Sequence, residues 1–228
     1  MKQFIAPDIF KDSVIAVFTR KHPGADLDAI SAMLKIKKED IFMPMQEHTD
    51  TIHILHADRK PVIADAIITR EQGVLLGIQV ADCVPILMHE SKRGVVSVVH
   101  AGWRGTAHAL LQKTIRLMIR EFTCRPENIQ MAMGPSIKWC CYEVDSDVFK
   151  AVMKQTGEGD YYKEKEDKHC LDLATANKIQ ALTLGVSEDN IWISDECTYC
   201  YPDKYYSYRY AKKPFGRQGG FIGHCSRA

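Results

Sequence analysis

The sequence predicts a mixed α+β fold, in which strands come in groups and do not alternate strictly with helices. Strand-like segments outnumber helix-like segments, and several follow one another before the clearest helix. Several strand-like segments are also apolar almost throughout, which indicates strands that are covered on both faces. We therefore favour this architecture over a doubly wound parallel sheet.

Strand signals lie at residues 14–18, 51–55, 73–80, 84–88, 94–100 and 129–133. The clearest helix signal covers 106–122, where apolar residues recur at helical spacing after a glycine-rich turn. A second helix signal covers 173–184 and follows Asp172, which we expect to be its N-cap. The charged stretch 155–168 predicts an exposed loop or a hairpin tip.

Composition indicates an ordinary globular protein with a sizeable core, since 46% of the residues are hydrophobic and 26% are charged. No linker or change of composition divides the chain, and we expect one domain over residues 1–228. The 30 basic and 29 acidic residues nearly balance, so no electrostatic reason favours nucleic acid as a partner.

Targeting signals are not evident. The first residues contain no apolar core of signal-peptide length, and the longest apolar runs are too short to span a bilayer. We expect a cytoplasmic monomer with no membrane association. In a reducing compartment, the eight cysteines are expected to be buried thiols, metal ligands or nucleophiles.

The most informative residues are Cys83 and His100, each at the boundary of a predicted strand. Neighbouring strand ends deliver side chains to a common point, so the two residues are candidates for one site. A pair seventeen residues apart is weak evidence alone. The alternative is a buried thiol and a hydrogen-bonded core histidine.

A Gly-Trp-Arg-Gly segment follows His100 and opens the first predicted helix. Backbone N–H groups at such a helix start suit an anion, and Arg104 is able to add bidentate contacts to phosphate. A structural salt bridge is an equally good interpretation of Arg104.

His48 also precedes a predicted strand and is the third candidate. His53 falls inside that strand and His56 lies just past its end, so we expect both to be surface or packing residues. Two histidines and a cysteine spread along the chain are typical of a catalytic zinc site, with three protein ligands and one open position. Copper is a possible substitute, because it binds such ligands more tightly.

Two further cysteine groups are expected to be less informative. Cys197 and Cys200 form a CxxC without a second CxxC, and we interpret them as partly buried thiols. Cys140 and Cys141 are adjacent; in a strand they would point to opposite faces. The aromatic and arginine-rich segment 205–223 predicts either a surface for a base and phosphate or an amphipathic edge strand.

Taken together, a series of motifs runs in order from residue 46 to the C-terminus, about four-fifths of the chain. They are 46–48 (QEH), 64–69 (ADAIIT), 81–87 (ADCVPIL), 99–106 (VHAGWRGT), 134–137 (GPSI), 141–144 (CYEV), 171–177 (LDLATAN), 197–198 (CT), 207–209 (SYR) and 216–218 (GRQ). This series resembles the YfiH-like family of purine nucleoside phosphorylases, formerly named multicopper polyphenol oxidases or laccase-domain proteins. The pairing of ADCVP with HAGWRGT is its most specific part.

The resemblance implies a β-sandwich flanked by helices and a zinc ion on His48, Cys83 and His100. It implies phosphorolysis of adenosine, inosine, guanosine and methylthioadenosine with inorganic phosphate, and deamination of adenosine. One departure is that the glycine-rich segment typical of the family after its first strand is replaced here by KHPGADLD at 21–28, which predicts altered substrate contacts.

Within that mechanism, we expect phosphate near Arg104, with Arg209 or Arg217 assisting, and substrate contact by Gln46. Deamination needs a carboxylate that carries protons, and Asp82 and Glu143 are the candidates.

Three alternatives remain at this point. A copper-dependent phenol oxidase is disfavoured, because the nine histidines include no His-x-His pair. A cysteine hydrolase would use Cys83 as nucleophile and His100 as base. A non-enzymatic module would sense a nucleoside or a metal.

Overall fold

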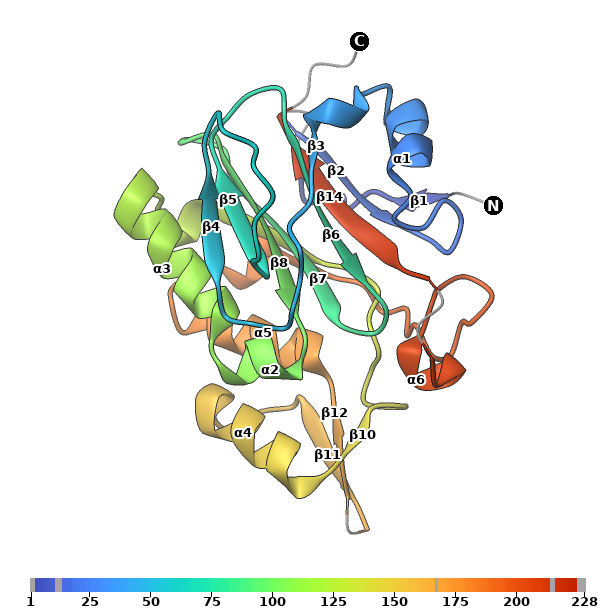
Figure 1. Ribbon diagram of the computed structural model, residues 1–228. Helices are drawn as coiled ribbons and strands as arrows, with labels where there is room; N and C mark the ends of the chain where they lie inside the picture. Colours follow the sequence, from blue (N-terminus) through green and yellow to red (C-terminus); the bar gives the residue numbers. More distant parts are fainter. Residues whose placement is uncertain (1–2, 11–13, 167, 214–215, 225–228) are drawn as a thin grey trace.

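Two β-sheets pack face to face in the computed structural model, which describes residues 3–10, 14–166, 168–213 and 216–224 (Figure 1). The first sheet has the order β1 (Phe4–Ile5), β2 (Ile15–Thr19), β14 (Gln218–Gly223), β6 (Leu75–Val80) and β3 (Ile41–Phe42). The second has the order β13 (Ile191–Ile193), β9 (Ile129–Met133), β7 (Val84–Glu90), β8 (Val95–Ala101), β5 (Ala66–Thr69) and β4 (Ile52–Leu55). Both sheets are mixed, since β3–β6, β4–β5 and β9–β13 are parallel pairs and the other pairs are antiparallel.

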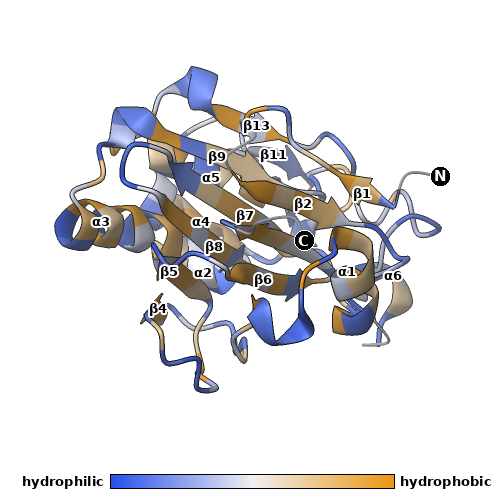
Figure 2. Cartoon of the chain, turned by 90° about the horizontal axis from the view of Figure 1, so that it is seen from above, coloured by the Kyte–Doolittle hydropathy of each residue, from blue (hydrophilic) through white to orange (hydrophobic). Residues whose placement is uncertain are grey.

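The core between the sheets is apolar and fully buried. Phe18 and Ile78 of the first sheet meet Leu87 and Val98 of the second, and all four have 0% exposure. The hydropathy colouring in Figure 2 shows apolar residues along the central strands of both sheets. The sandwich and the α+β class predicted above are therefore confirmed, and strands β7 and β8 are buried along their whole length.

Helices cover the outer faces. On the first sheet, α1 (Leu27–Leu34) buries Ile30 against Leu75 and Phe221. On the second sheet, α3 (Leu110–Phe122) and α5 (Leu173–Leu182) pack in a common core with β7 and β8. The remaining α-helices are α2 (Trp103–Ala107), α4 (Ser146–Thr156) and α6 (Tyr208–Ala211). A small sheet of β10 (Glu143–Val144), β12 (Lys168–Leu171) and β11 (Tyr162–Lys165) lies beside α4, and short 3₁₀ turns are η1 (Lys38–Asp40), η2 (Pro126–Asn128) and η3 (Glu188–Asn190) (Figure 1).

The predicted helix 106–122 is wrong as one element. Helix α2 begins earlier, at Trp103, and the chain turns at Ala109 before α3 begins. Ala109 has a left-handed backbone angle (φ 58°), which interrupts the helix. An alanine side chain gives no sign of that conformation, and the apolar spacing runs on across the break.

Other local predictions fare better. Asp172 caps α5 by accepting hydrogen bonds from the backbone N–H groups of Ala174 and Thr175, although the helix ends at Leu182. In the stretch 155–168, the end of α4 is followed by the hairpin of β11 and β12, while residue 167 lies outside the described residues.

The alternative of an edge strand at 205–223 is wrong, because β14 lies between β2 and β6. Within the described part of the chain, no helix is long and apolar enough to cross a membrane.

Candidate active site

Strand ends place the first two candidate residues together. Cys83 lies in the short turn between β6 and β7, and His100 is the last residue but one of β8. The antiparallel register pairs Pro85 with His100, which brings the turn beside the end of β8. His48 arrives from the loop between β3 and β4, with a left-handed backbone angle (φ 58°).

The donor atoms of His48, Cys83 and His100 all lie within 4.8 Å of one another. His48 Nε2 is 3.9 Å from Cys83 Sγ, and the rings of His48 and His100 meet edge to face at 4.8 Å between centroids. His100 is buried at 5% exposure, whereas His48 is exposed. Three donors converge from separate elements, with one side of the group open.

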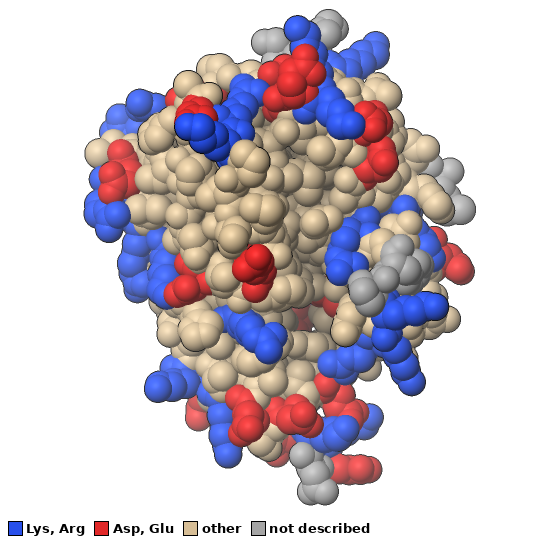
Figure 3. Space-filling view, viewed as in Figure 1, with Lys and Arg blue, Asp and Glu red and all other residues tan. Residues whose placement is uncertain are grey.

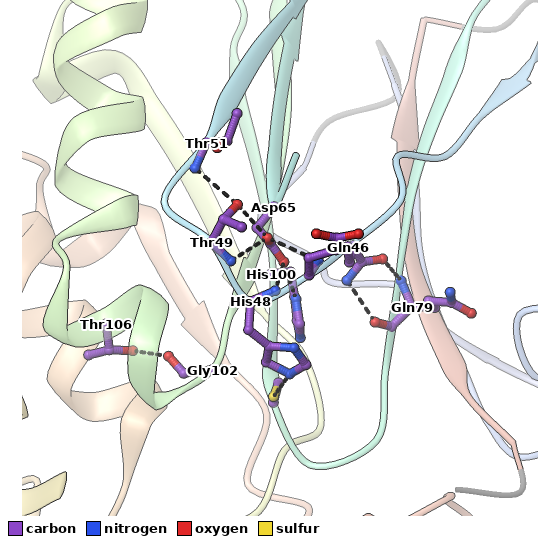
Figure 4. Close-up of polar contacts among 11 residues, drawn as sticks. Gln46, His48, Thr49, Thr51, Asp65, Gln79, His100, Gly102 and Thr106 are labelled. Atoms are coloured by element: carbon purple, nitrogen blue, oxygen red, sulfur yellow. Dashed lines mark hydrogen bonds and ion pairs between the residues drawn. The ribbon is translucent and has the colours of Figure 1, made fainter. Parts of the chain in front are cut away.

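Asp65 was not a candidate from the sequence, and it organises this group (Figure 4). Its fully buried carboxylate accepts a hydrogen bond from His100 Nδ1 at 2.7 Å and others from Thr49 Oγ1 and the backbone N–H groups of Glu47, His48 and Thr49. Burial opposes ionisation of Asp65, but the hydrogen bonds from His100 and Thr49 outweigh it and lower the pKa to about 2. One carboxylate therefore fixes the His48 loop. It also engages Nδ1 of His100, which leaves the other ring nitrogen, Nε2, to act as a metal ligand.

Cys83 and His100 stabilise each other's charged forms. Burial opposes both charges, yet the neighbouring histidines hold the pKa of Cys83 well below its usual range. The Cys83 thiolate and Asp65 raise the pKa of His100 against the same burial penalty. In the metal-free protein, both pKa shifts favour a thiolate on Cys83 beside an imidazolium on His100.

Gly102 leaves the space that the group needs. A Cβ atom at this position would lie 3.0 Å from Cys83 Sγ and 3.4 Å from His48 Cδ2. The first distance is tighter than most real Cβ contacts, and the second lies at the lower limit of ordinary van der Waals contact. A side chain at position 102 would therefore press against Cys83.

The group lies in the wall of a cavity of about 560 Å³. Eight of the nine candidate residues line it: Gln46, His48, Asp82, Cys83, His100, Arg104, Arg209 and Arg217. Tyr208, from the aromatic segment for which a surface for a base was one prediction, lines it as well. The sequence interpretation gave no role to Gln79, Trp103 and Tyr142, which also line it. Seen from the same side as in Figure 1, the surface in Figure 3 has basic and acidic side chains mixed over the visible face.

Three arginines give the cavity a positive lining. The guanidinium of Arg104 stacks 4.4 Å from the Trp103 ring centroid. Arg209 donates to the backbone oxygen of Glu143 at 2.9 Å and lies 5.2 Å from the Tyr142 ring. Arg217 donates to its neighbour's backbone oxygen. None of these contacts is an ion pair with a carboxylate, so the arginines keep their charge for an anion.

The polar candidates Gln46 and Asp82 are already engaged by the protein. The Gln46 amide donates to Gln79 O at 2.9 Å and accepts from Gln79 N at 2.8 Å, which fastens its loop to β6 (Figure 4). The Asp82 carboxylate accepts from Thr198 Oγ1 at 2.6 Å and from the backbone N–H of Arg209 at 2.7 Å. Both contacts are suited to positioning the cavity wall.

Glu143 does not reach the cavity. Its carboxylate pairs on the surface with Lys165 at 3.3 Å and Lys168 at 2.8 Å. It is therefore badly placed to carry protons for a substrate bound near Cys83. His53, in contrast, lies inside β4 against the Phe42 ring, as a packing residue.

The interpretation of the other cysteines needs correction. Cys140 and Cys141 lie in a turn and not in a strand, so their side chains are not forced to opposite faces. They gather with Cys197 and Cys200, and the four sulfur atoms lie within 4.8 Å of one another. The interpretation of Cys197 and Cys200 as two partly buried thiols missed this group, because the pair that completes it is not itself a CxxC.

Comparison with known proteins identifies the family. A family model described as multi-copper polyphenol oxidoreductase laccase matches residues 23–225. The chain belongs to this family.

Relatives with names support an enzyme. A protein of this family from Bacteroides thetaiotaomicron, named purine nucleoside phosphorylase, is 35% identical over 75% of this chain and 68% of its own length. A Deinococcus radiodurans protein of the same name is 35% identical over 85% of this chain and 74% of its own. One from an unknown prokaryotic organism, named adenosine deaminase RL5, is 32% identical over 79% and 73%. The chain is therefore an enzyme, and the non-enzymatic alternative is set aside.

Solved structures agree with the fold. YlmD from Geobacillus stearothermophilus superposes with a TM-score of 0.90 at 28% identity, covering 97% of this chain and 96% of that one. YfiH from Bacillus licheniformis gives a TM-score of 0.85 at 26% identity, covering 92% of each. Both structures therefore share this fold over nearly the whole chain.

Proposed function

We propose that this chain is a zinc-dependent purine nucleoside phosphorylase that acts on adenosine, inosine, guanosine or methylthioadenosine with inorganic phosphate. The observation that carries the proposal is the convergence of His48, Cys83 and His100 beside three arginines in one cavity. The names of the relatives supply the reaction class. We also propose that residues 1–228 act as one domain, in a cytoplasmic monomer with no nucleic-acid or membrane partner.

The donor set fits zinc. Two imidazoles and one thiolate are the ligands of catalytic zinc sites, which keep a fourth position open. Asp65 on His100 Nδ1 is the carboxylate partner that metal-bound histidines commonly have. When bound, zinc supplies a Lewis acid for a substrate oxygen. Copper is able to occupy the same ligands, in keeping with the description of the family.

In the proposed reaction, a phosphate oxygen bonds to the sugar carbon while that carbon's bond to the purine nitrogen breaks. The purine takes up a proton, and the products are the free base and the sugar 1-phosphate. Arg104, with Arg209 and Arg217, would hold the phosphate by charge-assisted hydrogen bonds. Fixing phosphate and sugar in one cavity removes much of the entropic barrier, and the arginine charges stabilise the phosphate as it attacks.

Aromatic side chains suit the base. Tyr142 and Tyr208 line the cavity and offer ring faces on which a purine is able to stack. Burial raises the pKa of Tyr142, and the nearby Cys83 adds to this effect. Its hydroxyl therefore stays protonated at neutral pH and is able to donate a hydrogen bond.

Adenosine deamination is the second candidate, because one relative carries that name. A proton carrier is then required, and Asp82 is the one carboxylate among the described residues that line the cavity. Both Asp82 oxygens already accept hydrogen bonds. We therefore propose phosphorolysis as the main activity and deamination as the slower one.

A thiol hydrolase is favoured by one observation, the chain of contacts from Asp65 through His100 to Cys83. His48 argues for metal, because a hydrolase needs no second histidine against the sulfur. Zinc bound stoichiometrically by the wild type, and lost from this site in a Cys83 variant, decides between the two.

A multicopper oxidase would need a blue-copper site and a three-copper cluster rich in histidine. The two possible metal-binding groups among the described residues contain two histidines between them.

A panel of nucleosides tests the proposal. Metal-replete protein is incubated with each nucleoside, with and without inorganic phosphate, and the products are identified by chromatography. We expect free base and sugar 1-phosphate only when phosphate is present. Inosine from adenosine in both conditions would favour deamination, and no product from any nucleoside would refute the proposal.

A further inference from the structure

Four cysteines from two distant turns meet outside the candidate active site. Cys140 and Cys141 come from the turn after β9, and Cys197 and Cys200 from the turn after β13. Their sulfur atoms lie within 4.8 Å of one another, and none of the four lines the cavity. Cys200 Sγ is 3.3 Å from Cys141 Sγ and 3.7 Å from Cys140 Sγ.

Backbone hydrogen bonds set this arrangement. The N–H groups of Cys141 and Tyr142 both donate to Lys138 O at 2.9 Å, which closes the first turn. In the second turn, Tyr201 N donates to Cys197 O at 3.2 Å. A bridge between Ser136 and Cys197 joins the two turns. The sulfurs are thus brought together by backbone geometry that does not depend on a bond between them.

The spacing suits one tetrahedral ion. Zinc bound to four thiolates at about 2.3 Å places each pair of sulfurs about 3.8 Å apart. The Cys200–Cys141 and Cys200–Cys140 distances, 3.3 Å and 3.7 Å, lie below that value, and no pair of the four sulfurs is more than 4.8 Å apart. We propose that Cys140, Cys141, Cys197 and Cys200 bind a single zinc ion through four thiolates.

Charge supports a cation at this position. Four sulfur atoms so close together cannot all ionise without a cation, because their charges repel. A divalent ion removes this cost, and tetrahedral sulfur ligation selects zinc or iron among the common metals. Zinc is the choice that needs no redox partner.

The site would be closed and structural, with no position left for substrate. Its effect on the enzyme would come through the cavity wall. Tyr142 follows Cys141 directly, and Thr198 lies within the second turn and donates to Asp82. Asp82 in turn accepts from the backbone of Arg209. The ion would hold Tyr142 on one turn and the Asp82 contact on the other in fixed relative positions.

This proposal does not depend on the proposed function, and the test keeps the two apart. Cys83→Ala empties the candidate active site and leaves the four cysteines intact. Protein purified under reducing conditions is measured for metal per chain by mass spectrometry and for metal ligands by X-ray absorption. We expect Cys83→Ala to retain one zinc with four sulfur ligands at about 2.3 Å and no nitrogen ligand.

Two further variants in the Cys83→Ala background complete the experiment. Adding Cys141→Ala and Cys200→Ala should remove the remaining zinc. Adding Cys170→Ala, a buried cysteine outside both groups, should leave it in place. The proposal is overturned if Cys83→Ala retains no metal, retains iron, or shows nitrogen ligands. A disulfide between the two turns in place of the ion, seen as two missing thiols, would overturn it as well. If the triple variant does not fold, the absorption spectrum of Cys83→Ala alone decides.

Discussion

The two groups of side chains able to hold a metal ion in this enzyme differ in how they are built. His48, Cys83 and His100 project from strand ends and an adjoining loop, with Asp65 fixing their orientation behind them. The four cysteines sit on two turns and have only sulfur donors. Mixed donors beside a cavity suit a reactive ion, whereas four thiolates suit an ion that only holds structure. The difference teaches that donor type and surroundings, more than the mere presence of cysteine, indicate chemistry.

The two groups are joined by a short chain of contacts. Thr198 lies in the turn that carries Cys197 and Cys200. Its hydroxyl donates a hydrogen bond to Asp82, which precedes Cys83. A change in one group should therefore reach the other weakly, through the wall of the cavity. This connection makes the comparison testable.

Asp65→Asn should have the largest effect among changes that leave every ligand in place. The amide cannot accept all the hydrogen bonds that the carboxylate accepts, so His100 and the His48 loop lose their alignment. We expect zinc affinity at this site and kcat/KM to fall about tenfold to a hundredfold. The four-cysteine group should keep its metal. Competition with a chelator, with the exposed Asp28→Asn as control, measures the affinity.

The same variant has a pH signature. The pKa of Asp65 is lowered to about 2, so its ionised form stabilises the fold above the unfolded value of about 4. That contribution, about 2.5 kcal/mol, is lost as pH falls from about 4 to 2. The free energy of unfolding of the metal-free wild type should therefore fall across this window by more than that of Asp65→Asn. Equal pH dependence of the two proteins would refute the role given to Asp65.

Thiol reactivity should separate Cys83 from Cys140 in metal-free protein. At pH 7, Cys83 with a pKa of about 6 is mostly thiolate, whereas Cys140 with a pKa of about 11 is almost wholly protonated. The thiolate fraction of Cys83 therefore exceeds that of Cys140 by about 10⁴. Because thiolates of low pKa are weaker nucleophiles, the rate of reaction at Cys83 should exceed the rate at Cys140 by only some tens of fold. Reaction with an aromatic disulfide, followed by peptide mapping, measures both rates. Faster reaction at Cys140 would contradict the assigned environments.

Thr198→Val should have the smallest effect, because it removes one hydrogen bond between the groups. The buried Asp82 oxygen loses its partner, at a cost of about 1–3 kcal/mol in the free energy of unfolding. We expect kcat/KM to fall by a few fold and both ions to remain bound. Thr114→Val is the matched control, since its hydroxyl bonds only to its own helix. An unchanged enzyme would show that the link between the groups is unimportant.

Much of the fold was predictable because periodic apolar segments determine buried strands. The strand after Cys83 and the strand that holds His100 are mostly apolar and buried throughout, so their ends could be found from the sequence. The motifs were enough to name the three arginines of the cavity. That the three line the same cavity follows only from the fold. Family likeness supplied His48, which precedes a strand with no chemical signal of its own.

The rest depended on conformations that side chains do not announce. Ala109 breaks a helix through a left-handed angle that its sequence neighbours do not indicate. Adjacent Cys140 and Cys141 converge only because a turn directs them, and the strand rule gave the opposite expectation. Asp65 stood within a quoted motif, yet its contacts with His100 and three loop amides need the tertiary structure.

Adenine release from adenosine and inorganic phosphate by Cys83→Ala, beside wild type and Cys170→Ala, tests the central claim most directly. The account predicts that Cys83→Ala loses at least about 10³-fold in kcat/KM, as removal of a member of a catalytic unit does. It also predicts that the variant keeps one zinc, on the four cysteines, and that Cys170→Ala stays close to wild type. Adenine release by Cys83→Ala at the wild-type rate would contradict the account.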